Sequence, residues 1–171
     1  MDKFQFYFRS ADKKPGKGVG DEISDPTKYQ NLNTIKDWRR MFSSLYESRF
    51  AYDSFTFNTA EHALQYEKLK TSGYIDEAYT FAIESRSDLA QSSGIIAHKN
   101  RKLVILTEEQ LSAWRTARPA INEKITMAKF SVQPMKSALL GTGDAELWNA
   151  GPRINTIRCR TLEKVRGNLR K

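Results

Sequence analysis

The stretch that decides the fold spans residues 42–69 and reads FSSLYESRFAYDSFTFNTAEHALQYEKL. Its middle has aromatic residues at alternate positions on both sides of the pair Asp53 and Ser54, which is typical of two short strands joined by a tight turn. These aromatic residues are Phe50, Tyr52, Phe55 and Phe57. A β-hairpin is therefore predicted here, followed directly by a helix.

The helix is predicted over residues 58–71, with Asn58 as its cap and Glu61 completing a capping box. At about 100° per residue, Glu61, Gln65 and Lys68 fall within a sector of about 60°. A carboxylate, an amide and an ammonium then share one stripe. The stripe has two interpretations: a solvated ion-pair face, or the floor of a site for a polar ligand.

Outward from this centre the pattern is mostly helical. An early strand is predicted from the alternation of Phe4, Phe6 and Phe8, and residues 11–30, rich in Gly, Pro and Lys, are expected to form a loop insertion. Within this loop, GKGVG lacks the spacing of a phosphate-binding motif. Helices are predicted at NTIKDWRRMF, YIDEAYTFAIES, SDLAQSSG, TEEQLSAWRTAR, INEKITMAKF and PMKSALL.

Particular residues are expected to limit these helices. Gly94 is assigned as a stop and Pro119 as a break between two helices, whereas Thr107 and Gln110 form a second capping box. KLVIL, before that box, is either a strand or an extended approach to the helix. The whole predicts one compact domain over residues 1–171, mainly α within the α+β class, with a small β element.

The composition limits the function classes. Apolar residues make up 39% of the chain and no apolar run approaches the ~20 residues of a membrane span, so we expect no membrane partner. Cys159 is the only cysteine, and the two histidines have no ligand-like partners at regular spacing. We therefore expect an intracellular, cytoplasmic protein with no metal and no cofactor. The net charge of +8 favours a nucleotide or nucleic-acid partner, or is merely a solvated basic surface.

Residues 42–69 resemble the signature of the NADAR superfamily of YbiA-like proteins without a gap. The chain departs from that signature at Ser44 and Ser54, where the family prefers Asn and Gly. The residues that match are Phe42, Ser43, Tyr46, Ser48, Phe50, Asp53, Phe57, Thr59, Glu61, His62, Gln65 and Lys68. Trp114, AKF at residues 128–130 and LLGTGDAELW at residues 139–148 are similar to later landmarks. The tail lacks the Trp-Gly stretch with which many bacterial members end.

The resemblance implies an N-glycosidase that hydrolyses a bond between ribose C1 and nitrogen without a metal. Its substrate would be either ADP-ribosylated guanine in nucleic acid or a ribosylamino-pyrimidine intermediate of riboflavin synthesis. The net positive charge favours nucleic acid as the substrate, because a polymer offers many phosphates for positive charges to contact. The alternative is a non-catalytic module with the same fold that binds ADP-ribose or nucleic acid.

The resemblance assigns the chemistry to carboxylates. Glu61 would stabilise the cationic centre at ribose C1 and orient the attacking water, unless it serves only in the capping box. Asp144 would donate a proton to the leaving base or bind a ribose hydroxyl, or else cap the segment after Gly143. His62 is interpreted as a packing or hydrogen-bonding residue rather than an acid catalyst.

Other side chains would bind the substrate. Trp114 and Trp148 would stack on the base, with core packing as the alternative for each. Gln65 and Lys68 would bind ribose and phosphate, although Lys68 can also pair with Glu61. Tyr7, together with the neighbouring Phe6, would line the pocket by family analogy.

Overall fold

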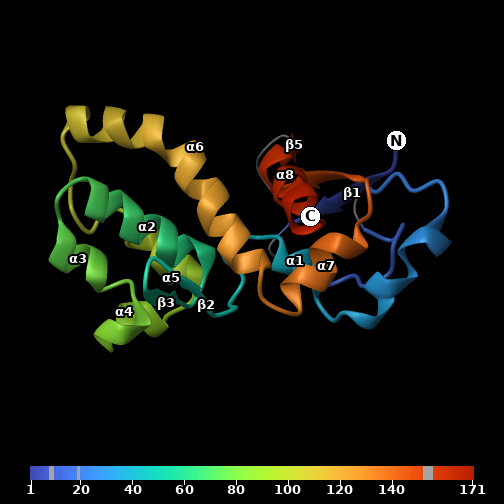
Figure 1. Cartoon of the computed structure of the whole chain (residues 1–171), viewed down its shortest axis with the longest axis horizontal. Helices are drawn as coiled ribbons and strands as arrows, with labels where there is room; N and C mark the ends of the chain where they lie inside the picture. Colours follow the sequence, from blue (N-terminus) through green and yellow to red (C-terminus); the bar gives the residue numbers. More distant parts are fainter. Residues whose placement is uncertain (8–9, 19, 152–155) are drawn as a thin grey trace. The chain divides into compact units, whose positions relative to one another are not determined.

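The computed structural model describes residues 1–7, 10–18, 20–151 and 156–171. These residues form two compact units (Figure 1), and each is described by itself. Unit 1 comprises Met1–Ser43 and Phe130–Lys171, and unit 2 comprises Ser44–Lys129. Phe8, part of the predicted first strand, and Val19, part of GKGVG, lie outside the described residues. The expectation of a single domain stays a prediction.

Unit 1 contains a small sheet with helices and an apolar core. Its strands have the order β1-β4-β5, with β1 parallel to β4 in a register that pairs Phe4 with Leu147, and with β4 antiparallel to β5. Phe4 packs edge-on against Trp38, with ring centroids 5.2 Å apart, and both side chains are fully buried. The elements of unit 1 are β1 (Lys3–Phe6), the 3-10 helix η1 (Pro26–Thr34), α1 (Trp38–Met41), α7 (Met135–Gly141), β4 (Glu146–Asn149), β5 (Ile157–Arg158) and α8 (Arg160–Leu169).

The loop insertion of unit 1 is organised by one buried arginine. The guanidinium of Arg39 has no exposed surface, and it pairs with Asp21 at 2.7 Å. It also donates to the backbone carbonyls of Gln5, Asp12 and Lys14 at 2.9–3.0 Å. The end of the expected insertion is not a loop, because η1 begins at Pro26. The side chain of Asp25 caps η1 by accepting from the backbone N–H of Thr27.

Unit 2 begins with the predicted hairpin, which is confirmed. Strands β2 (Phe50–Tyr52) and β3 (Phe55–Phe57) pair antiparallel, and the turn residues Asp53 and Ser54 have φ angles of 50° and 66°. Positive φ at both central positions is the requirement of the tight turn whose twist matches paired strands. The other elements of unit 2 are α2 (Ala60–Thr71), α3 (Ile75–Tyr79), the 3-10 helix η2 (Ile83–Ser85), α4 (Asp88–Gln91), α5 (Gly94–Lys99) and α6 (Glu108–Phe130), of which only Phe130 belongs to unit 1.

The start of α2 differs from the prediction. Thr59, not Asn58, is the cap, because its hydroxyl accepts from the backbone N–H of His62 at 3.2 Å. The amide of Asn58 instead donates to the carbonyl of Ser92 at 2.9 Å. Glu61 is therefore free of the capping box, and its carboxylate is available for other contacts.

Two predicted helix limits are wrong and one capping box is right. Gly94 begins α5 rather than stopping a helix, because Ser93 caps that helix. Glycine is needed at this position, since a Cβ would lie 2.6 Å from the backbone of Leu45. Pro119 lies inside the continuous α6, at an exposed position. Thr107 and Gln110 form the reciprocal capping bonds at 3.0 and 3.2 Å. KLVIL, residues 102–106, is the extended approach to α6 and not a strand.

Candidate active site around Glu61

The stripe predicted on α2 is turned into the protein. Glu61 and Gln65 are 6% and 7% exposed, and the side-chain amide of Gln65 donates to Oε1 of Glu61 at 2.8 Å. The backbone N–H of Glu61 is bound to the carbonyl of Ser44 at 3.0 Å, which fixes the first turn of the helix. The interpretation of the stripe as a solvated face is thus wrong for these two residues.

A second donor to Glu61 comes from a helix that sequence reasoning missed. His98, in the last turn of α5, places its Nδ1 3.0 Å from Oε1 of Glu61, and the imidazole is 52% exposed. The two residues are 37 positions apart, so local spacing carries no signal of this contact. The two adjacent serines before Gly94 were the available signal for a helix cap. A helix predicted from that cap would have ended near His98.

Both contacts leave the other carboxylate oxygen open. Oε2 of Glu61 has no hydrogen-bond partner in the part of the chain that the structure describes, and it is not sealed from solvent. A carboxylate whose one oxygen is held by two nitrogen atoms presents its second oxygen in a fixed direction. Ser48, another residue of the matching signature, has a buried hydroxyl without a partner among the described residues.

Lys68 lies on the same stripe but does not pair with Glu61. Its ammonium donates to the backbone carbonyl of Arg101 at 2.8 Å, and Arg101 in turn donates to the carbonyl of His98 at 3.1 Å. Burial, followed by the positive charges of Arg101 and Arg118, lowers the pKa of Lys68. Several cations therefore gather beside this end of the stripe, which suits an anionic group of a ligand.

His62 has the structural role that its interpretation expected. Its Nδ1 lies 2.8 Å from the hydroxyl of Thr59 and its Nε2 lies 2.9 Å from the carbonyl of Leu89. The ring is fully buried, and this burial lowers its pKa. Both ring nitrogens are thus engaged in holding α2 against the segment that contains Leu89.

Trp114 lies on α6 in the apolar core of unit 2. Its side chain is 7% exposed and belongs to a cluster with Phe57, Leu64 and Ile125. The core-packing alternative for Trp114 accounts for this position. Stacking of Trp114 on a substrate base stays a prediction.

The remaining predicted site residues belong to unit 1. Tyr7 is half-buried and directly follows β1, where Phe6 is buried. Asp144 is exposed and forms an ion pair of 2.6 Å with Arg170, and this hydrogen bond lowers the pKa of its carboxyl. An ionised Asp144 is better suited to accept a hydrogen bond from a ribose hydroxyl than to donate a proton. Its place in the site stays a prediction.

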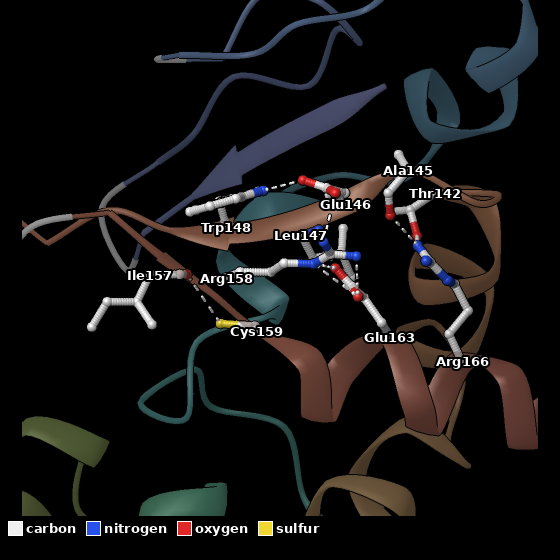
Figure 2. Close-up of polar contacts among 10 residues, drawn as sticks. All are labelled: Thr142, Ala145, Glu146, Leu147, Trp148, Ile157, Arg158, Cys159, Glu163 and Arg166. Atoms are coloured by element: carbon white, nitrogen blue, oxygen red, sulfur yellow. Dashed lines mark hydrogen bonds and ion pairs between the residues drawn. The ribbon is translucent and has the colours of Figure 1, made fainter. Parts of the chain in front are cut away.

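Trp148 is held within a polar cluster on β4 (Figure 2). Its indole N–H donates to Glu146 at 2.9 Å, and Arg158 bridges Glu146 at 2.6 Å and Glu163 at 3.0 Å. The ammonium of Lys3 lies 5.0 Å from the centre of a Trp148 ring. One face of the Trp148 ring is therefore already in contact with the ammonium of Lys3. Its role in stacking on a substrate base stays a prediction.

The described residues contain no cluster of His, Cys, Asp or Glu that could hold a metal ion. Burial raises the pKa of the Cys159 thiol to about 11, so this cysteine is a poor nucleophile near neutral pH. Within the described ranges, no helix has the length and apolar character needed to cross a membrane.

Comparison with known proteins identifies the fold. No protein-family model and no curated protein matches this sequence. Among solved structures, the NMR structure of the E. coli protein YbiA matches 99% of this chain and 84% of its own, with a TM-score of 0.58 and 18% sequence identity. The chain has a YbiA-like fold. The predicted α+β class, mainly helical with a small β element, is thereby confirmed.

Proposed function

We propose that the protein is an N-glycosidase that hydrolyses a bond between ribose C1 and a base nitrogen, without a metal in the catalytic step. The observation that carries the proposal is the geometry of Glu61: a nearly buried carboxylate, held at Oε1 by Gln65 and His98, with Oε2 open. The YbiA-like fold and the signature around Glu61 support the same conclusion.

The chemistry follows from where charge develops. When the C1–nitrogen bond breaks, its electron pair leaves with the base and the sugar becomes an oxocarbenium ion, positive at C1 and O4. A fixed carboxylate oxygen near C1 stabilises that charge, and it can accept a proton from the water that then attacks C1. In this scheme Oε2 of Glu61 faces the reacting sugar, and Gln65 and His98 position the carboxylate.

The charge near the stripe supports an anionic substrate. The positive charges of Arg101 and Arg118 both act on Lys68, and phosphate is the anion that ribosylated substrates carry. We propose ADP-ribosylated guanine in nucleic acid as the preferred substrate, because the net charge of +8 favours a polymer. A ribosylamino-pyrimidine phosphate of riboflavin synthesis is the second substrate to be assayed.

The decisive experiment compares two carboxylates of one helix. Purified protein in EDTA is incubated with an ADP-ribosylated DNA oligonucleotide and, separately, with the ribosylamino-pyrimidine. Release of ADP-ribose from the DNA and of the free pyrimidine from the second substrate is followed. We expect Glu61→Gln to reduce release by at least about 100-fold. Glu67→Gln is the matched control, because Glu67 is also 6% exposed on α2 but is bound to Tyr52 and Lys70.

The alternative is a non-catalytic binder of ADP-ribose or nucleic acid. The ion pair between Asp144 and Arg170 favours the binder, because it keeps the proposed proton donor, Asp144, ionised. Tight binding of both substrates by the wild type, with no release of ADP-ribose or pyrimidine, would establish the binder and refute the glycosidase.

A further inference from the structure

A cavity lies on unit 2, away from Glu61. Its volume is about 370 Å³, within the range of small ligand sites. Lys70 follows Glu61 by nine residues, so it projects about 180° away around the α2 axis. The cavity is thus on the opposite side of α2 from the proposed active site, and its other lining residues come from β3 and α3. It is lined by Phe55, Tyr66, Lys70, Ile75, Asp76 and Tyr79.

Aromatic rings form the walls of this cavity at steep angles to one another. Phe55 meets Tyr66 edge-on at 77° and meets Tyr79 at 58°, with centroids 5.8 and 5.3 Å apart. Inclined rings cannot sandwich a flat nucleobase between parallel faces. They form a corner, and the exposed faces of such a corner attract a cation through their quadrupoles.

The cavity already contains one example of that chemistry. The ammonium of Lys70 lies 5.3 Å from the centre of the Tyr66 ring and pairs with Asp53 at 2.6 Å and Glu67 at 3.3 Å. Lys70 is thus satisfied by a ring and two carboxylates. The same combination of ring and carboxylate is repeated at the rim by Tyr79 and Asp76.

Asp76 is the unpaired member of this second combination. Its carboxylate forms no hydrogen bond or ion pair with any residue in the described part of the chain, and Tyr79 beside it is 37% exposed. Asp53 and Glu67, which lie behind the lining, pair with the ammonium of Lys70, and Asp76 lines the cavity itself. The cavity is therefore locally acidic on a protein whose net charge is +8.

We propose that this cavity binds the side chain of an arginine in an extended segment of a partner protein. A planar guanidinium can stack on an aromatic face while its N–H edge forms paired hydrogen bonds with a carboxylate, which an ammonium cannot do. The guanidinium would lie against Tyr79 and Phe55 and pair with Asp76. The aliphatic stem would pack on Ile75, which is 59% exposed.

The test uses blocked pentapeptides with one central residue between glycines and serines. The central residue is arginine, lysine or citrulline, the last being a neutral isostere of arginine, and binding is followed by chemical-shift changes in ¹⁵N-labelled full-length protein. We expect the arginine peptide to shift amides of α3 and β3, and to bind at least about fivefold more tightly than the citrulline peptide.

Variants separate this cavity from other acidic surfaces. Asp76→Asn should weaken the arginine peptide by about threefold to tenfold and leave the citrulline peptide unchanged. Tyr79→Leu should weaken both peptides, whereas Glu77→Gln, the exposed neighbour on α3 that does not line the cavity, should change neither.

Three results would overturn the proposal. They are equal binding of the arginine and citrulline peptides, tighter binding of AMP than of the arginine peptide at these amides, and concentration-dependent shifts without peptide, which would indicate a second copy of the chain as the occupant. Hydrolysis of the glycosidase substrates by the Tyr79→Leu variant should equal that of the wild type. The cavity and the glycosidase can therefore fail independently.

Discussion

At the scale of single residues, Glu61 illustrates which contacts a sequence encodes. Gln65 is four residues from Glu61 on one helix, so their contact could be predicted from helical geometry. His98 reaches the same oxygen from α5, and that contact depends on how the chain folds between the two helices. The most informative polar contact of the candidate site was therefore not predictable from spacing.

His98 should act through Glu61 rather than on the substrate. We expect His98→Ala to lower kcat by up to about 100-fold with little change in KM, because the carboxylate loses a group that orients it. Since the imidazole is half-exposed, added imidazole should restore part of the activity. Steady-state hydrolysis with and without imidazole measures both effects.

Ile95→Ala on the exposed surface of α5 is the control for helix stability. A His98→Ala enzyme with unchanged kcat would show that the contact with Glu61 has no part in catalysis.

At the scale of elements, the sequence predicted two local features correctly, but it did not predict the cap of α2 or the limits of α5 and α6. The hairpin and the capping box of α6 carry their own turn and cap chemistry, and both were predicted. Pro119 does not break α6 because its missing N–H lies at an exposed position, while Trp114 and Ile125 anchor the helix on both sides of it in the core. β5 is two residues long and depends on β4 for its pairing.

The hairpin turn places backbone strain at Ser54. Ser54 has a φ of 66°, a conformation that glycine adopts without strain. We expect Ser54→Gly to raise the free energy of unfolding by up to about 1 kcal/mol, since the relief of strain is partly offset by the greater freedom of glycine in the unfolded chain. Urea denaturation measures the change.

Ser54→Ala separates backbone strain from loss of the hydroxyl, because alanine keeps the Cβ. If Ser54→Gly is no more stable than Ser54→Ala, backbone strain at this position is not the cause.

At the scale of the whole molecule, the charge distribution includes a lysine that is hidden from solvent. Lys129, near the end of α6, is 2% exposed, and this burial lowers its pKa to about 7 from an ordinary value of 10.5. Between these two pH values the unfolded chain binds more protons than the folded chain. The free energy of unfolding should therefore rise with pH in this window, and the benefit should be absent below about pH 7.

The corresponding measurement is urea denaturation at several pH values from 7 to 9.5. We expect Lys129→Met to flatten the rise, and Lys124→Met, an exposed position on the same helix, to leave it unchanged. Equal slopes for wild type and Lys129→Met would show that Lys129 is not the group responsible.

The anchoring of residues 12–21 by Arg39 limits how this chain can be edited. A surface insertion can usually be trimmed with little harm, but here three of the guanidinium's acceptors, at Asp12, Lys14 and Asp21, come from the insertion itself. Deleting the segment would leave the buried guanidinium of Arg39 without most of its hydrogen-bond acceptors. We therefore expect a related protein that lacks the segment to have an uncharged residue in place of Arg39.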